Sequence, residues 1–307
     1  MKILVTGGSG MVGSAFKHVK TDHEIVLVGS RQYDLTSSDE TWDMFKDERP
    51  DAVIHLAAKV GGVKGNTDYV ADFFFDNIMI NTNVLQAAND FKVPRVVSLL
   101  STCIYPDNPK YPLTEDQIHL GEPHQSNFGY AYAKRMLDVQ SRAIRQQYGR
   151  QYVTVVPNNI YGPNDNFDLE TGHVIPAIIR KVYEAKINNT KPSFWGTGIA
   201  QREFTYSVDV ARALMWAVQN YQNPKPLNIG CQNEISIYEL VCMVQELLDY
   251  NSTSVWDNQM PEGQVRKPSS SAIFQNLNPD FEYTSLRSGL QKTIEWFLKE
   301  YPNVRGI

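Results

Sequence analysis

The sequence has little cysteine and no paired cysteine motif. Only Cys103, Cys231 and Cys242 occur among 307 residues, an odd number with no CxxC spacing. A disulfide framework needs paired cysteines, and structural zinc sites usually draw on clustered ones. The sequence therefore argues against both, and any cysteine chemistry would have to come from a free thiol.

Long apolar runs and an excess of positive charge are also missing. No apolar stretch approaches the roughly 18 residues that a membrane helix needs, and the stretch Met1-Lys2-Ile3-Leu4-Val5 meets glycine too soon to form a signal-peptide core. The 29 Lys and Arg against 34 Asp and Glu give a formal charge of -5, which offers no surface for a polyanion. We therefore expect a cytoplasmic protein that binds neither nucleic acid nor membrane.

What is present is the composition of an ordinary globular protein. Hydrophobic residues make up 42% of the chain and charged residues 21%, which excludes a disordered or fibrous protein. A chain of 307 residues is long enough for one large core or two smaller domains.

Strand-like and helix-like segments alternate through the first half of the chain. Apolar strand signals occur at residues 1–6, 25–28, 52–56, 95–100 and 152–156. Helical signals lie between them, through residue 19 and over residues 81–91 and 130–148. Such alternation is typical of a parallel sheet covered by helices on both faces. We predict an α/β fold with a doubly wound parallel Rossmann sheet.

The pattern changes after residue 163, which predicts a second, smaller α/β domain. A polar loop (164–172) is followed by a helix (174–185) and a glycine-rich turn (195–198). A helix at 208–220 and a strand at 227–229 then resume the earlier pattern. We therefore predict domains at 1–163 and 164–307, with the chain returning to the first domain at about 206–230.

A glycine turn follows the first predicted strand at Gly7, Gly10 and Gly13. Glycines in this position let backbone N–H groups and a helix N-terminus face a diphosphate, because no side chain blocks the approach. A purely structural turn is the alternative, but the strand and helix around it favour dinucleotide binding.

The end of the second strand bears on which dinucleotide is bound. An acidic residue there usually binds the ribose hydroxyls of NAD, whereas this strand ends in Gly29-Ser30-Arg31. A guanidinium suits the 2′-phosphate of NADP. The alternative is a solvated Arg31 with Asp34 as the ribose ligand; we favour NADP.

Tyr130 and Lys134 are four residues apart and share one face of the predicted helix. We expect the ammonium to lower the pKa of the phenol from its usual value of about 10, so that the tyrosine can protonate a ketone oxygen. Such a pair alone is commonplace on protein surfaces. It becomes specific together with the glycine turn and with Ser101, which ends a predicted strand where ligands of such sheets bind.

These motifs resemble the extended short-chain dehydrogenase/reductases, most of which act on nucleotide sugars. The resemblance rests on Thr6-Gly7-x-x-Gly10-x-x-Gly13, His55-Leu56-Ala57-Ala58, Ser101 and Tyr130-x-x-x-Lys134, and it continues through residues 101–106, 158–167, 172–176 and 195–198.

The resemblance is strongest to the branch that epimerises GDP-4-keto-6-deoxy-D-mannose at C3 and C5 and then reduces C4 with NADPH. It implies that the first domain binds NADP, that the second binds the GDP-sugar, and that two chains form a homodimer through paired helices of the first domain.

The epimerisation chemistry points to Cys103 and His173. A C4 ketone makes the hydrogens on C3 and C5 acidic, and inverting each carbon needs a base and an acid whose pKa values lie near neutrality. Related dehydratases have an Asp-Glu pair at the positions of Thr102 and Cys103, so a dehydratase is disfavoured. The alternatives are a small buried cysteine, as expected for Cys231 and Cys242, and a histidine with only a local hydrogen bond.

The resemblance assigns the rest of the site residue by residue. Lys181 stands where the family often has arginine and cannot form the same planar contact, and Lys267 is nearly as well explained as a solvated loop lysine. The predicted catalytic residues are Ser101, Cys103, Tyr130, Lys134 and His173. The predicted cofactor residues are Gly7, Gly10, Met11, Val12, Gly13, Arg31, Asp34, Leu35, Leu56, Ala57, Ala58, Tyr130, Lys134, Pro157, Asn158, Ile160 and His173. The predicted substrate residues are Asn159, Lys181, Trp195, Arg202 and Lys267.

No metal is expected, because His119 and His124 lie in a proline-bearing loop without a carboxylate cluster. Two other functions stay open at this point. One is a different nucleotide-sugar epimerase or reductase. The other is a redox-sensing module that binds the dinucleotide without turnover, which the presence of Ser101, Tyr130 and Lys134 disfavours.

Overall fold

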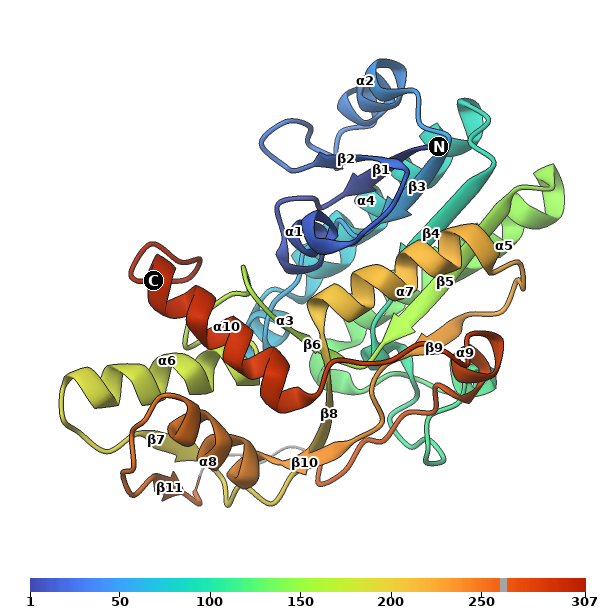
Figure 1. Cartoon of the computed structure of the whole chain (residues 1–307). Helices are drawn as coiled ribbons and strands as arrows, with labels where there is room; N and C mark the ends of the chain where they lie inside the picture. Colours follow the sequence, from blue (N-terminus) through green and yellow to red (C-terminus); the bar gives the residue numbers. More distant parts are fainter. Residues whose placement is uncertain (260–263) are drawn as a thin grey trace.

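A central sheet of six parallel strands organises the first half of the molecule, in the order β2-β1-β3-β4-β5-β9 (Figure 1). The computed structural model describes residues 1–259 and 264–307, the side chains of residues 63 and 64 excepted. Strand β2 lies on one side of β1, and β3, the next strand along the chain, lies on its other side. The connections therefore diverge at β1, and a ligand crevice is expected beyond the carboxyl ends of these strands. The strands are β1 (Lys2–Thr6), β2 (Glu24–Val28), β3 (Ala52–His55), β4 (Arg95–Leu99), β5 (Gln151–Pro157) and β9 (Leu227–Ile229).

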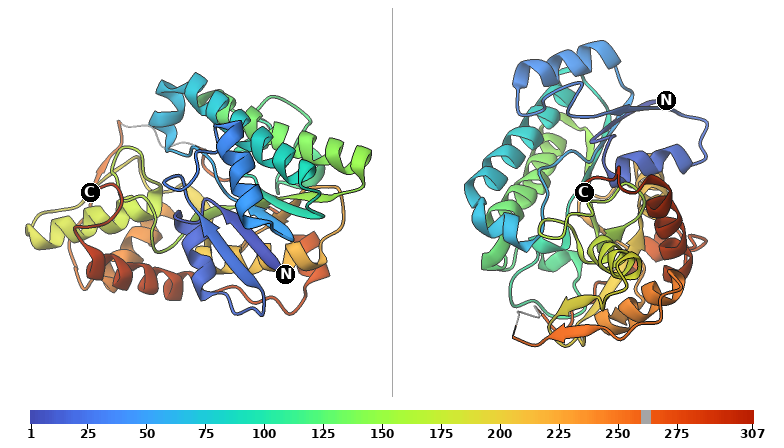
Figure 2. Two further views of the ribbon diagram at one scale, coloured as in Figure 1. Left: turned by 90° about the horizontal axis from the view of Figure 1, so that it is seen from above. Right: turned by 90° about the vertical axis from the view of Figure 1, so that its left-hand side faces the viewer.

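Helices cover both faces of this sheet, which confirms the predicted doubly wound fold. One core lies beneath α1 (Met11–Ala15) and α7 (Ser207–Asn220). The opposite core lies beneath α2 (Ser38–Glu48), α4 (Val70–Asp90) and α5 (Phe128–Tyr148). Figure 2 shows α4 and α5, in cyan to green, lying side by side. Because both faces are covered, β3 is buried at all four positions and consists mostly of apolar residues.

Two helices differ from the sequence-based expectation. Helix α4 begins at Val70 rather than at residue 81, because its inner face carries the buried polar residues Asn77 and Asn81 and the apolar periodicity is interrupted. Asn77 is satisfied there by hydrogen bonds with the backbone of Lys59 and Phe73. The helix expected through residue 19 ends at Ala15 and continues only as a 3₁₀ turn over Phe16–His18.

A second layer of structure lies beyond the carboxyl ends of the central strands. Its aromatic core includes Phe167, which stacks on Phe297 with ring centroids 4.7 Å apart. It contains the sheet β10 (Glu234–Ser236), β8 (Gln201–Tyr206) and β6 (Asn159–Tyr161), the pair β11 (Val255–Asp257) and β7 (Ser193–Trp195), and the helices α6 (Val174–Ile187), α8 (Ile237–Leu247) and α10 (Leu286–Glu300).

The chain passes between the two layers more than once. Strand β6 follows β5 after one residue, and β9 pairs with β5 in the central sheet before β10 joins the second layer. The domain limits at residue 163 and at about 206–230 stay a prediction. Two short helices, α3 (Val63–Asp68) and α9 (Ala272–Leu277), and the 3₁₀ turns η2 (Thr102–Ile104), η3 (Glu115–Gln117) and η4 (Gln125–Asn127) complete the described elements.

None of the helices among the described residues combines the length and apolar character needed to cross a bilayer.

Candidate active site

A cleft of about 1650 Å³ runs along the carboxyl ends of the central strands and continues under the second layer. Most of the predicted site residues line it, although they come from segments far apart in the sequence. They are Gly7, Gly10, Met11, Val12, Gly13, Arg31, Asp34, Leu35, Leu56, Ala57, Ala58, Ser101, Cys103, Tyr130, Pro157, Asn158, Asn159, Ile160, His173, Arg202 and Lys267.

The glycine turn is too tight to accept side chains. Gly7 has φ +69°, and a Cβ there would lie 2.9 Å from the backbone nitrogen of Ala57. A Cβ on Gly13 would lie 2.3 Å from the carbonyl oxygen of Gly7. A Cβ on Gly10 would have only the Gly7 carbonyl oxygen, at 3.2 Å, as a close neighbour. The backbone at Gly10 therefore faces open cleft, which fits the close approach of a diphosphate.

A buried network joins this turn to β3, and the sequence analysis missed its role. The Thr6 hydroxyl oxygen accepts hydrogen bonds from the backbone N–H groups of Leu56 and Ala57, both at 3.2 Å. The same hydroxyl is 2.8 Å from Nδ1 of His55, whose Nε2 is 3.1 Å from Oδ1 of Asn81. Burial lowers the pKa of His55 to about 3, so this histidine is neutral and positions the cofactor side of the cleft.

Arg31 and Asp34 lie at the same end of the cleft but are differently engaged. Oδ1 of Asp34 accepts hydrogen bonds from the backbone N–H and the hydroxyl of Thr36, which lower the pKa of the carboxyl. Within the described part of the chain, Arg31 has no hydrogen-bond or ion-pair partner. The exposed guanidinium is therefore available to a ligand, whereas the carboxylate already stabilises a local turn.

Ser101 and Cys103 face one another at the end of β4. Ser101 caps the η2 turn, and the Cys103 thiol donates a hydrogen bond to the Ser101 hydroxyl oxygen at 3.2 Å. Burial raises the pKa of the thiol, while Ser101 and the cations of Lys267 and Lys134 act in the opposite direction. The resting thiol therefore carries its proton at neutral pH.

Tyr130 and Lys134 share one face of α5, as predicted, but the predicted lowering of the phenol pKa is wrong for this structure. The Lys134 ammonium lies 5.9 Å from the centre of the Tyr130 ring and donates a hydrogen bond to the Leu99 carbonyl oxygen at 2.9 Å. Burial, followed by the charge of Cys103, raises the pKa of Tyr130 well above its ordinary value. Burial also lowers the pKa of Lys134 to about 8, because an ammonium is poorly solvated there.

His173 enters the cleft from the second layer, where it is the N-cap residue of α6. Its Nδ1 is 3.8 Å from Oδ1 of Asp165, and this carboxylate raises the pKa of the imidazole. Burial and the charge of Arg305 act against that rise. The sequence analysis did not single out Asp165, although an acidic residue in the same loop as a predicted catalytic histidine was a usable signal.

Glu203 is a second residue that the sequence analysis missed. It is buried on β8, where Oε2 accepts hydrogen bonds from the backbone N–H (3.0 Å) and hydroxyl (2.6 Å) of Ser269 and from Nδ2 of Asn158 (3.3 Å). Its backbone carbonyl accepts from Nδ2 of Asn159 at 2.8 Å. Glu203 thus fixes two predicted ligand residues and the loop that carries Lys267.

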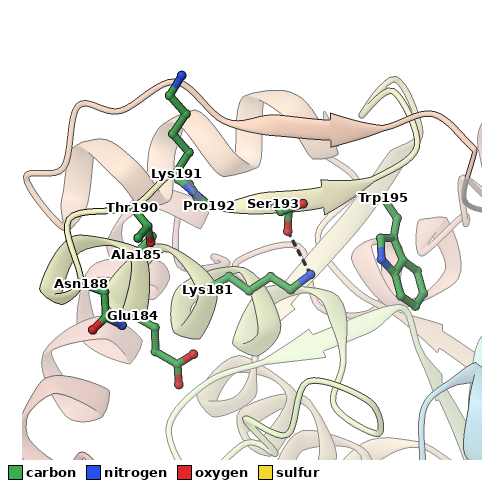
Figure 3. A pocket seen from close by; sticks show the side chains of 9 residues that line it. All are labelled: Lys181, Glu184, Ala185, Asn188, Thr190, Lys191, Pro192, Ser193 and Trp195. Atoms are coloured by element: carbon green, nitrogen blue, oxygen red, sulfur yellow. Dashed lines mark hydrogen bonds between the residues drawn. The ribbon is translucent and has the colours of Figure 1, made fainter.

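Two of the predicted substrate residues lie outside the large cleft. Lys181 and Trp195 line a separate depression of about 330 Å³ between α6 and β7 (Figure 3). The Lys181 ammonium donates a hydrogen bond to the Ser193 carbonyl oxygen and lies 5.9 Å from the Trp195 ring centre. The indole is 62% exposed. The structure therefore places these two residues together but separates them from Cys103 and His173.

Arg202 and Lys267 lie within the cleft, in different surroundings. Burial lowers the pKa of both cations. The charge of Cys103 raises the pKa of Lys267, and the charge of Arg202 lowers it. Lys267 is half-buried, so the solvated loop lysine considered above is not what the structure contains. Its role toward a substrate stays a prediction.

Among the described residues, no group of three or more His, Cys, Asp or Glu side chains has an arrangement that could hold a metal ion.

The fold and the cleft together define a class of protein. A glycine turn that fits a diphosphate shares one cleft with Ser101 and Tyr130, and Lys134, on the same helix as Tyr130, binds the Leu99 carbonyl at the end of a parallel strand. This combination is that of a dinucleotide-binding α/β enzyme that acts at a carbonyl group.

Comparison with known proteins narrows the class. Residues 3–230 match the NAD dependent epimerase/dehydratase family. GDP-L-fucose synthase of Dictyostelium discoideum is 42% identical, over 99% of this chain and 97% of that protein. The Escherichia coli GDP-L-fucose synthase is 35% identical over 99% of both chains. A GDP-L-fucose synthetase from Naegleria fowleri bound to NADP has a TM-score of 0.94 and 39% identity, and covers 99% of this chain and 94% of that chain.

The chain belongs to the NAD dependent epimerase/dehydratase family and, within it, to the group of the GDP-L-fucose synthases.

Proposed function

We propose that this protein converts GDP-4-keto-6-deoxy-D-mannose to GDP-L-fucose, by epimerisation at C3 and C5 followed by reduction at C4 with NADPH. The observation that carries the proposal is that the thiol of Cys103 and the imidazole of His173 line the same cleft as Tyr130 and Ser101. Two acid–base groups in addition to the reductase residues are what an epimerase that also reduces requires. The GDP-L-fucose synthase relatives, which match nearly the whole chain, support the same reaction.

The cofactor would lie along the glycine turn and the ends of β2 and β3. NADPH, when bound, supplies the hydride that reduces C4. Gly10 leaves the backbone accessible to the diphosphate, Arg31 can meet the 2′-phosphate, and the Thr6–His55 network fixes the ends of the strands beneath. The Naegleria fowleri structure with NADP supports this cofactor.

The protein's own groups then divide the chemistry. In epimerisation, one of Cys103 and His173 removes the proton beside the C4 ketone and the other returns one from the opposite face. Ser101 donates a hydrogen bond to the oxygen on which charge develops. In reduction, Tyr130 gives its proton to O4. The raised pKa of the phenol keeps that proton in place at neutral pH until negative charge develops on O4.

The substrate would reach from this centre toward the second layer. Asn159, Arg202 and Lys267 line the cleft on that side, and their polar and cationic groups suit a sugar and a diphosphate. Lys181 and Trp195 would receive the distal, base-containing end of the nucleotide in their own depression.

We also propose a cytoplasmic homodimer. The outer surface of α4 carries Phe75, which is 62% exposed, and Met79; Val139 is exposed on the neighbouring α5. Burying these side chains against a second copy would remove apolar surface from water. The three cysteines are free thiols, which suits a reducing compartment.

The deciding experiment is incubation with GDP-4-keto-6-deoxy-D-mannose and NADPH. Loss of NADPH absorbance together with an L-fuco product is expected. Reduction without inversion would indicate a simple 4-reductase, and binding of NADPH without turnover would indicate a sensor. Either result would refute the proposed function.

A further inference from the structure

Asp165 is a buried carboxylate in the cleft that none of the roles above uses. Its residue is 4% exposed, and Asn164, before it, has φ +63°. Its Oδ2 atom is buried and has no hydrogen-bond partner among the described residues. A buried carboxylate oxygen without a donor is unfavourable unless another interaction compensates for it. The burial of this carboxylate therefore costs stability, which a role in the site would explain.

The imidazole of His173 lies beside the other oxygen of this carboxylate, Oδ1. Oδ1 of Asp165 accepts a hydrogen bond from the Asn166 backbone N–H at 2.7 Å, which fixes the carboxylate, and it lies 3.8 Å from Nδ1 of His173. The histidine is fixed in turn, because its carbonyl oxygen accepts from the Ala177 N–H in the first turn of α6. Catalytic hydrogen bonds are often long in the absence of substrate and shorten when it binds.

We propose that Asp165 is a positioning residue for His173: it accepts a hydrogen bond from Nδ1–H and leaves Nε2 as the ring nitrogen that exchanges a proton with the sugar. The inference rests on the proposed function, because it assigns a partner to one of the two epimerising groups. A carboxylate behind a histidine selects the tautomer, orients the ring and stabilises the imidazolium.

The proton inventory of the step is simple. When protonated His173 acts as the acid, its Nε2–H bond breaks, the enolate electron pair forms the new C–H bond, and the C4 carbonyl is restored. The described charged groups that act on this imidazole are Asp165, which raises its pKa, and Arg305, which lowers it.

The test is Asp165→Asn, which preserves the shape of the side chain and removes its charge. Ring-proton NMR of the histidines, with His173→Gln to assign the signal, should show that His173 titrates at lower pH in the variant than in wild type. Deuterium uptake at C3 and C5 of the keto sugar should fall about tenfold or more, toward the range typical of impaired acid–base catalysis. NADPH affinity, measured by titration calorimetry, should not change.

Asp168→Asn is the matched control. Asp168 belongs to the same loop, but its Oδ1 accepts hydrogen bonds from the backbone of Glu170 and Thr171 and does not pair with His173. The Asp168→Asn variant should show the same His173 titration as wild type. Asp165→Glu keeps the charge but displaces it, and it is used if Asp165→Asn does not fold. Asp165→Glu should slow deuterium exchange while His173 still titrates above its ordinary pKa.

Two results would overturn the inference. One is an unchanged His173 titration in Asp165→Asn. The other is loss of exchange to the same degree in Asp168→Asn, which would mean that only the shape of the loop matters. Failure of the proposed function would look different, because wild type itself would not turn over the GDP-sugar while the NMR titration would still show whether Asp165 and His173 interact.

Discussion

The two halves of the site differ in how rigidly their side chains are held. Near the central sheet, the Lys134 ammonium is fixed on the Leu99 carbonyl oxygen and Cys103 on Ser101. In the second layer, Trp195 is 62% exposed and Lys181 is only half-buried, whereas Lys134 is buried. Reacting groups need positions fixed to a fraction of an ångström, whereas a flexible polar substituent can be recognised by more mobile side chains. The difference predicts that substitutions in the first half impair chemistry and those in the second impair binding.

The largest effect is expected for Cys103→Ser. A serine hydroxyl keeps the hydrogen bond to Ser101 but is a far poorer base, so epimerisation should fall by roughly a hundredfold to ten-thousandfold. Deuterium uptake at C3 and C5 measures this loss, and NADPH binding should be retained. Cys231→Ser is the control, because that half-buried cysteine does not line the cleft. Uptake at the wild-type rate in Cys103→Ser would remove the thiol from the mechanism.

Tyr130→Phe should slow reduction by more than about a hundredfold, the range for a lost general acid. Uptake of deuterium should fall less, because Ser101 can still donate to the oxyanion. NADPH absorbance and the mass of the recovered keto sugar measure the two reactions on one variant. Tyr132→Phe, two residues along α5, should match wild type. Equal losses in both reactions of Tyr130→Phe would show that the phenol serves enolisation as much as reduction.

Arg31→Ala should weaken NADPH by about tenfold to a hundredfold, since a charge-assisted contact is worth roughly 1.5–3 kcal/mol. NADH should be affected much less, because it lacks the 2′-phosphate. Arg31→Lys keeps the charge without the planar fork, so its affinity for NADPH should lie between those of wild type and Arg31→Ala. Titration calorimetry with both cofactors decides the matter; equal losses would mean that Arg31 contacts another part of the cofactor.

The pH dependence of reduction should report Lys134. Its pKa of about 8 in the folded protein lies below the ordinary 10.5, so the ammonium is present below pH 8 and lost above it. If the charge is required, kcat/KM should fall above pH 8, by about tenfold over the next unit or so. Lys134→Met should be slow at all pH values without this decline. A wild-type profile that stays level to pH 9.5 would exclude a catalytic need for the charge.

Stability should respond to Lys134 in the opposite sense. Between pH 8 and 10.5 the unfolded chain holds this proton and the folded protein does not, so the free energy of unfolding attributable to Lys134 rises with pH. Comparing urea denaturation of wild type and Lys134→Met across this range isolates the contribution of the one group.

Trp195→Ala should have the smallest effect. Stacking of a base on an aromatic ring is worth about 1–3 kcal/mol, and the low end applies to an indole that is mostly exposed. The KM for the GDP-sugar should rise about fivefold while kcat is unchanged. Tyr238→Ala, at another exposed aromatic of the second layer, is the control. A large fall in kcat for Trp195→Ala would show that the second half of the site also governs the geometry of the reaction.

Local patterns were sufficient for much of the fold but not for all of it. Strands such as residues 52–56 and 152–156 were recognisable because a parallel sheet buried on both faces requires nearly continuous apolar residues. Helix α4 was underestimated, because Asn77 and Asn81 are buried there through hydrogen bonds to groups distant in sequence. A polar residue that is satisfied only by a tertiary partner looks exposed in a local pattern.

The site shows the same division. The glycine turn and the Tyr130–Lys134 pair are local features with a direct chemical meaning, so they could be found from the sequence. Glu203 could not, because its hydrogen bonds reach Asn158 and Ser269, 45 and 66 residues away. The direction of the Tyr130 pKa was also beyond the sequence, since burial raises it and only the folded structure gives the burial.

The sequence by itself determined the order of strands and helices, the turn for the diphosphate and the types of reactive group, because each depends on residues close together in the chain. Tertiary structure decided that Cys103 and His173 share one cleft, that Lys181 and Trp195 lie outside it, and that Oδ1 of Asp165 lies 3.8 Å from Nδ1 of the histidine. These relations depend on how two layers pack, and packing distances and desolvation arise only when segments distant in the chain come together.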